Sequence, residues 1–318
     1  MKPGLIALVV LLLGAAPPLG AAHAQTSLAA DVSTLDEVVV RARRAGAPMW
    51  AVERGDSVVI LIGSIEGVPQ GYDWRPEALE VAARESQRIL YPMEARASPA
   101  DLLRLLWRIR TVARLPSGTT IADHVPPDLL ARIERLQADE RSDSWRTGSM
   151  VGLSFDLLDE IPRGQRRSGA AGVVRAAARA ARVEGEPVGI VRGDELIDNL
   201  INLPPRAYLP CVEAATAAAE AGSAGAAARL DDWRSLRVPE VLANPVDVAL
   251  NLCWPSGDPE MAPALRTRWA EAANVALGRP GVTLAVAPLR ILAEPGGVLD
   301  QLEAQGLDPR GPVWKQGE

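Results

Sequence analysis

Two glutamates follow segments expected to be strands, at the positions where sites form in open α/β proteins. Glu66 lies next to the end of the stretch Ser57–Gly67, in which β-branched and aliphatic residues run up to Gly63. Glu94 directly follows the segment Arg88–Met93. If the two strands are parallel neighbours, both carboxylates leave the same edge of the sheet. There they could share a proton or bind a cation, or each could pair with one of the many arginines.

Histidine is almost absent from the chain, which has only His23 and His124. His23 lies in a segment expected to be removed as part of a signal peptide, so one imidazole would remain. His124 lies in a polar stretch before Pro126-Pro127, which favours an exposed loop position. A metal site with two histidine ligands therefore cannot be built after cleavage. The sequence also has no Gly-x-Ser-x-Gly elbow that could pair with His124.

The amino end has the pattern of a secretory signal peptide. Lys2 precedes an apolar run over residues 4–14, and Ala22-His23-Ala24 supplies a small-x-small end. This run is too short for a spanning helix of about twenty residues, and no later stretch is long enough. Cleavage after Ala24 would leave Gln25 as the first residue and place the protein in the periplasm, with no membrane span.

The composition of the 318 residues describes an acidic protein with ample material for a core. It has 40 Asp and Glu against 34 Lys and Arg, a formal net charge of −6, and 48% hydrophobic residues. This balance of charges does not indicate the basic surface that nucleic-acid-binding proteins use, so nucleic acid is not expected as a partner. The sequence does not distinguish a protein partner from a small molecule, and the scattered tryptophans are more typical of a core than of a binding platform.

The two cysteines of the chain are Cys211 and Cys253. In an oxidising compartment two cysteines usually pair, so a Cys211–Cys253 disulfide is predicted. A zinc site is disfavoured because the two thiols lack the CxxC spacing of such sites.

The elements that position Glu66 and Glu94 belong to an α/β (α+β) fold. We expect a flexible N-terminal arm over residues 25–47 and a single domain over residues 48–318. In this domain an N-terminal and a C-terminal strand–turn–helix unit form a central mixed sheet around a large helical insert, at about residues 98–280. The first unit implies a right-handed parallel crossover between its strands.

The periodicity of apolar residues and the turn signals give the expected element boundaries. Strands are expected over Met49–Glu53, Ser57–Ile65, Arg88–Met93, Pro187–Val191, Gly281–Val286 and Gly311–Trp314. Helices are expected over Pro76–Gln87, Ser98–Val112, 126–139, Ser142–Leu158, Gly169–Val183, Asp194–Leu203, Leu209–Ala221, Ala226–Leu236, Pro239–Ala243, Glu260–Leu277 and Gly296–Gln305.

A strand that ends in Gly63-Ser64-Ile65-Glu66, followed by a helix, a strand and Glu94, resembles the start of the TraB/GumN family. In that family the first strand ends in Gly-x-x-His and the next ends in glutamate. The C-terminal part is also similar, with Arg266 or Arg268 on a helix and Ala287-Pro288-Leu289-Arg290 after a strand, at the place of a second Gly-x-x-His. The resemblance covers about residues 48–314. In the animal members of the family, the two Gly-x-x-His motifs and the glutamate form a metal-dependent protease site. The resemblance implies that the corresponding positions of this chain lie together.

The chain departs from the family pattern at both histidine positions. Glu66 replaces the first histidine, and Arg290 replaces the second. The resemblance then implies that these two side chains face each other and form an ion pair that fills a former site. Glu94 would accept hydrogen bonds from Arg290 or from Arg266 and Arg268.

Two functions follow from these departures. The first is an exported, catalytically inactive binding or scaffold protein without a cofactor. The alternative is a peptidase-like, metal-dependent hydrolase with a rebuilt carboxylate site, in which Glu66, Glu94 and Asp73 bind a hard divalent cation such as Mg²⁺, Ca²⁺ or Mn²⁺. The charge of Arg290 favours the first, because a guanidinium repels a cation from the same pocket.

Overall fold

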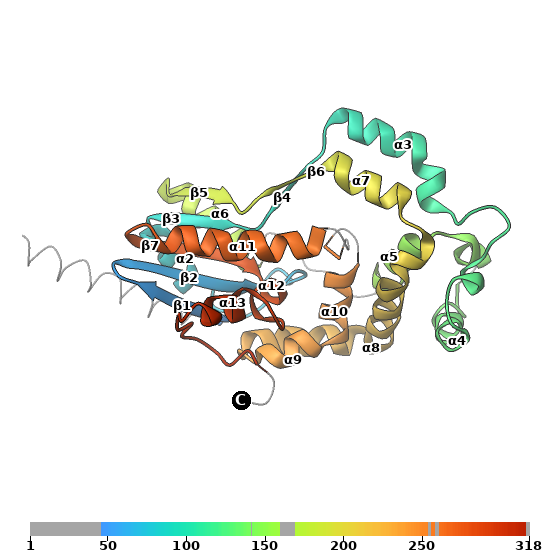
Figure 1. The fold of residues 1–318 in the computed structure, drawn as a ribbon. Coiled ribbons are helices and arrows are strands. Elements are labelled where there is room, and N and C mark those ends of the chain that lie inside the picture. The colour runs from blue at the N-terminus through green and yellow to red at the C-terminus, as the bar shows by residue number, and fades with distance from the viewer. Residues whose placement is uncertain (1–45, 141, 160–168, 254–255, 258–260, 316–318) are drawn as a thin grey trace, which may run out of the picture.

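A computed structural model describes residues 46–140, 142–159, 169–253, 256–257 and 261–315. It shows a twisted sheet with helices against it and a larger group of helices beside it (Figure 1). The expected signal peptide, its cleavage position and nearly all of the expected N-terminal arm lie outside the described residues. In the described ranges no helix is long and apolar enough to cross a membrane.

The main sheet has five strands and is mixed, which confirms the predicted fold class. Its strands are β1 (Met49–Arg54), β2 (Ser57–Ser64), β3 (Arg88–Tyr91), β5 (Glu184–Pro187) and β7 (Gly281–Pro288). They lie in the order β1-β2-β7-β3-β5. The hairpin partner β1 runs antiparallel to β2, and the other three neighbouring pairs are parallel.

The condition that β2 and β3 are direct neighbours is not met, because β7 lies between them. The strand β7 carries an unbroken buried run from Val282 to Ala287. A strand that is apolar on both faces requires neighbours on both sides and helices above and below, which is a central position. The two sequence units therefore interleave: the C-terminal strand enters between the two strands of the N-terminal unit.

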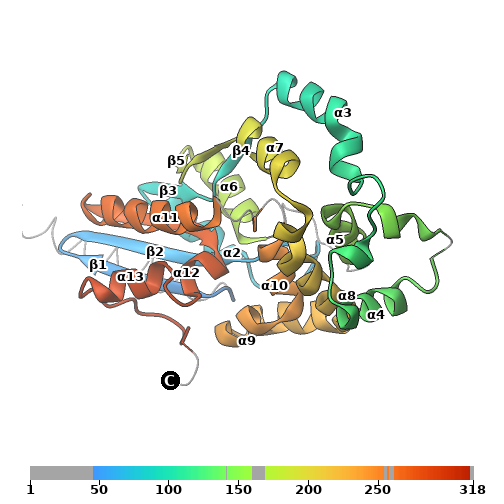
Figure 2. The ribbon, with the colours of Figure 1, turned by 45° about the vertical axis from the view of Figure 1, so that its right-hand side comes forward.

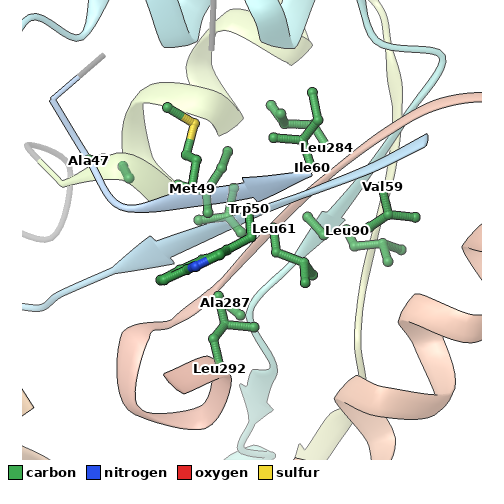
Figure 3. Close-up of a cluster of buried hydrophobic side chains, with 14 of the residues drawn as sticks. Ala47, Met49, Trp50, Val59, Ile60, Leu61, Leu90, Leu284, Ala287 and Leu292 are labelled. Atoms are coloured by element: carbon green, nitrogen blue, oxygen red, sulfur yellow. The ribbon is translucent and has the colours of Figure 1, made fainter. Parts of the chain in front are cut away.

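Helices cover both faces of the sheet (Figures 1 and 2). One face carries α2 (Glu77–Glu85) and α6 (Ala170–Ala181), and the other carries α11 (Met261–Leu277), α12 (Leu289–Ala293) and α13 (Val298–Ala304). Figure 3 shows the aliphatic side chains of the strands, with Trp50, packed against these helices. Trp50, Ile60, Leu61 and Leu284 are at most 2% exposed.

A second core lies in the helical part and is separate from the core of the sheet. It is formed by η1 (Ile121–Asp123), α4 (Pro127–Leu136), η2 (Asp143–Thr147), α5 (Met150–Asp159), η3 (Pro205–Tyr208), α8 (Leu209–Arg234) and α10 (Pro245–Leu252). The short helix α9 (Val238–Ala243) connects α8 to α10. The predicted Cys211–Cys253 disulfide is confirmed; it joins the start of α8 to the end of α10 inside this core.

Two helices stand at the outer edge of the helical part (Figures 1 and 2). They are α3 (Pro99–Ala113) and α7 (Gly193–Asn202), and they pack against each other. Each follows one strand of a separate two-stranded parallel ribbon, formed by β4 (Glu94–Arg96) and β6 (Ile190–Arg192). The ribbon thus carries the chain from the sheet edge to this helical pair.

Several boundaries differ from the sequence-based expectation for local reasons. The single helix expected over Ser142–Leu158 is two elements, because Gly148 is extended and the Ser149 hydroxyl caps the start of α5. The strand expected over Pro187–Val191 is divided between β5 and β6 at Gly189, whose φ of 145° breaks it. The strand expected over Gly311–Trp314 is absent, and Arg310 alone bridges to β1.

Removal of the disulfide by the paired changes Cys211→Ala and Cys253→Ala should lower the free energy of unfolding by about 3–4 kcal/mol. The bond closes a loop with a sequence separation of 42, and its loss restores the conformational freedom of that loop in the unfolded chain. Equilibrium urea denaturation measures the change. Reducing agent should lower the stability of the parent protein and leave the variant unaffected; equal stability of the two oxidised proteins would contradict the prediction.

Candidate functional site

The two motif segments singled out in the sequence lie side by side at one edge of the sheet. The strands β2 and β7 pair in parallel register, with Gly63 opposite Ala287 and Ser64 opposite Pro288. The Ser64 hydroxyl donates to the Ala287 carbonyl oxygen at 2.8 Å. The segments that contain Glu66 and Arg290 therefore leave adjacent strand ends, as expected for sites in open sheets.

Gly63 is required by close packing at this edge. A Cβ atom at this position would lie 2.4 Å from Leu289 Cδ1 and 3.4 Å from the Trp50 ring. The Gly63 carbonyl oxygen accepts a hydrogen bond of 2.8 Å from the indole of Trp233, which is fully buried. Close approach of its neighbours is therefore the role of this glycine, since its φ is not in the positive region.

Arg290 pairs with a carboxylate that sequence reasoning did not consider. Its Nη2 donates to Asp247 Oδ2 at 3.0 Å and to the Leu242 carbonyl oxygen at 2.5 Å. The Asp247 side chain is 2% exposed, and that of Arg290 is 19% exposed. The Nε atom of Arg290 is buried and has no hydrogen-bond partner among the described residues. The guanidinium is thus held inside the protein by α9 and α10.

Arg229 completes a buried network around Asp247. Its Nε and Nη2 donate to Asp247 Oδ1 at 2.9 and 2.8 Å, and its Nη1 donates to the Glu66 carbonyl oxygen at 2.7 Å. The Arg229 side chain is 4% exposed. We call Arg229, Asp247 and Arg290 the Asp247 network. One carboxylate faces two guanidiniums, so the formal charge of the network is +1, and it links α8, α10 and α12 to the end of β2.

The predicted ion pair between Glu66 and Arg290 is wrong. Within the described residues no salt bridge within 4.0 Å joins the two side chains, and Arg290 is paired with Asp247 instead. The Glu66 side chain is exposed, and its contribution to the network is its backbone carbonyl group. An exposed carboxylate keeps its hydration, whereas burial beside Arg290 would remove it, and Asp247 already supplies the counter-charge.

Glu94 is held by an arginine other than the three expected. Its Oε1 accepts from Arg175 Nη1 at 2.8 Å, and Arg96 lies 4.0 Å from its Oε2. The Arg175 guanidinium also lies 4.7 Å above the ring of Tyr91, whose hydroxyl pKa is raised by burial. Glu94 therefore belongs to a second, half-exposed cluster at the end of β3, and no ion pair joins it to Arg290 within the described residues.

The remaining predicted residues are not brought together. Arg266 pairs with Glu294, whereas Arg268 is exposed and has no ion-pair partner among the described residues. Asp73 is exposed. His124 follows η1 in the helical part; it is half-buried, not in the exposed loop position expected, and its Nε2 lacks a partner among the described residues.

The chemistry of this edge is dominated by guanidinium–carboxylate pairs. Among the described residues no group of three or more His, Cys, Asp and Glu side chains could hold a metal ion. Arginine cannot serve as a metal ligand because it stays protonated and has no free lone pair. The side chains of this edge can bind charged or hydrogen-bonding groups. Among the described residues they do not supply the set of oxygen and nitrogen ligands that hydrolytic metal centres use.

Sequence reasoning missed Asp247 and Arg229. Helix α10, which carries Asp247, was not predicted, although Asn244-Pro245 is a helix-start signal; the Asn244 side chain accepts from the Val246 N–H as a cap. Asp247 lies two residues after Pro245, in the first turn of α10. An aspartate at such a position is ordinarily explained by its favourable interaction with the helix dipole. Arg229 follows an Ala-rich run and carries no distinguishing pattern.

Comparison with known proteins gives one match. A sequence model of the TraB/PrgY/gumN family matches residues 48–310, which is most of the chain. No curated protein and no solved structure matches the chain.

The change Asp247→Asn should lower the free energy of unfolding by about 3–5 kcal/mol, because it leaves two buried guanidiniums without a counter-charge. Asp231→Asn is the matched control. Asp231 also accepts from two arginines, Arg234 and Arg237, but it is half exposed, so its change should cost less than about 1 kcal/mol. Urea denaturation measures both; equal effects would show that burial of the Asp247 network is unimportant.

Proposed function

We propose, from the premise that this chain belongs to the TraB/PrgY/gumN family, that it is a binding or scaffold protein without metal-dependent hydrolytic activity. Its partner would be a protein or a small molecule. The observation that carries the proposal is the position of Arg290, which occupies the place where the resemblance implies a histidine ligand and is bound to Asp247.

The Asp247 network supports this function in two ways. The guanidinium of Arg290 cannot bind a metal ion, and the network has an excess positive charge that would repel one. Both arginines are already held by short hydrogen bonds to Asp247 and to the carbonyl oxygens of Glu66 and Leu242. Rebuilding a metal site here would require these bonds to break inside the protein.

The alternative, a hydrolase with a rebuilt carboxylate site, has less support. It needs Glu66 and Glu94 to act together on one cation. Glu94 is bonded to Arg175, and Arg96 is close to it, whereas Glu66 is exposed beside a different strand end. A cation would have to displace Arg175 before it could use the Glu94 carboxylate.

We also infer export to the periplasm. The support is the signal-peptide pattern of residues 1–24 together with the Cys211–Cys253 disulfide, since disulfides persist in oxidising compartments. An acidic, mixed-charge exported protein would meet its partner outside the cytoplasm.

Metal analysis tests the main proposal. The purified protein, incubated with Mn²⁺, Mg²⁺, Ca²⁺ or Zn²⁺ and then freed of unbound ions, should retain far less than one ion per chain, and its melting temperature should not depend on the ion. Glu184→Ala, at an exposed glutamate of β5, is the control for Glu66→Ala and Glu94→Ala. Stoichiometric metal that survives the control change and is lost in the other two would establish the alternative.

Intact-mass analysis tests export. In a Gram-negative host that expresses the whole chain, the periplasmic fraction should contain a protein that begins at Gln25 and has lost two hydrogens to the disulfide. Replacement of Leu11 and Leu12 by arginine would interrupt the apolar run and should abolish processing. A chain that keeps residues 1–24 in the cytosolic fraction, without these changes, would contradict the inference.

A further inference from the structure

Helix α3 exposes an apolar stripe that is separate from the face it packs on α7. Leu103, Leu106 and Trp107 are spaced i, i+3 and i+4, which places them on one side of the helix. They are 63%, 71% and 89% exposed. Trp107 is the most exposed of the large hydrophobic residues in the described part of the chain. Scattered exposed apolar residues are normal, but three on adjacent turns of one helix form a contiguous surface.

The same helix is basic in a protein that is acidic overall. Residues 99–113 contain Asp101 and the three arginines 104, 108 and 110, and Arg114 follows, whereas the whole chain has a net charge of −6. Arg108 and Arg114 are exposed and have no ion-pair partner among the described residues. Arg104 pairs with Asp198 of α7 at 2.5 Å, which links α3 to its neighbour. Positive charge therefore borders the apolar stripe.

The position of α3 in the fold leaves this stripe accessible. The helix lies at the outer edge of the molecule, with α7 on its inner side (Figures 1 and 2). Its start is fixed by a capping box between Ser98 and Asp101. The high exposure of the three side chains shows that no described part of the chain covers the stripe.

We propose that the face of α3 formed by Leu103, Leu106, Trp107 and the bordering arginines docks on an anionic phospholipid surface. A helix with tryptophan and leucine on one face and arginines beside them has the composition of helices that lie in the membrane interface. The indole of Trp107 suits the headgroup level, and the arginine stems can lie along the acyl boundary while their charges meet lipid phosphates. The proposal does not depend on the binding or scaffold function proposed above.

Charge complementarity favours a lipid surface over a second copy of this chain. A symmetric dimer through this face would bring two basic helices together, because the same patch is used on both sides. An anionic bilayer offers opposite charge along the whole helix, and each arginine near it contributes to attraction. Charge on this face therefore opposes self-association and favours the bilayer.

Vesicle co-sedimentation of the purified protein tests the proposal. The protein should bind vesicles of phosphatidylglycerol and phosphatidylcholine in equal parts, should not bind phosphatidylcholine vesicles, and should be released by salt. The paired changes Leu103→Gln and Trp107→Gln should weaken binding about tenfold or more. Arg108→Gln should weaken it about fivefold.

Two matched controls separate this face from general surface effects. Val275→Gln removes an exposed apolar side chain of α11, and Arg279→Gln removes an exposed arginine distant from α3 in the sequence; neither should change binding. Circular dichroism should show that all variants remain folded. The proposal would be overturned by absence of binding to the anionic vesicles, by equal binding of the α3 variants, or by a dimer in light scattering that only the α3 variants dissociate.

Discussion

A single buried carboxylate, that of Asp247, organises the sheet edge on which the candidate site depends. It is the counter-ion of both Arg229 and Arg290, and through them it connects three helices to the end of β2. Two guanidiniums buried without it would carry a large desolvation cost. The helical part therefore cannot move away from the sheet edge without exposing or separating these charges, and the site keeps its form only while α10 stays docked.

The parallel pairing of β2 with β7 is the second constraint, because it brings together residues more than two hundred positions apart. Both strands were predictable, since each is an apolar run bounded by turn residues. The disulfide was predictable from the cysteine count together with the signal-peptide pattern, which indicates an oxidising compartment. The order of the strands was not, because insertion of β7 between β2 and β3 is decided by packing on both faces and leaves no local signal.

The ion-pair partners show why the site was harder to predict than the fold. An acid at position 66 and a base at position 290 are complementary, and the resemblance places them opposite each other, so pairing was the natural hypothesis. Charge complementarity, however, does not select among the many carboxylates of an acidic chain. Asp247 is the partner of Arg290 because it is buried at the start of α10. Its negative charge there also interacts favourably with the helix dipole. Burial of a particular side chain is a tertiary property, and the sequence pattern around Asp247 suggested only a helix start.

The charged groups of the sheet edge differ from those of helix α3 in how far they are engaged inside the molecule. At the sheet edge, Arg175, Arg229, Arg266 and Arg290 are all engaged by carboxylates, and Arg268 is the exposed exception among the arginines considered there. Interaction needs groups whose bonds are not already made inside the molecule. The outer face of α3 offers such groups, apolar and basic, on a helix that has a capping box at its start and is linked to α7 by Arg104. The arginines at the sheet edge are thus engaged inside the molecule, whereas exposed apolar and basic side chains lie together on α3.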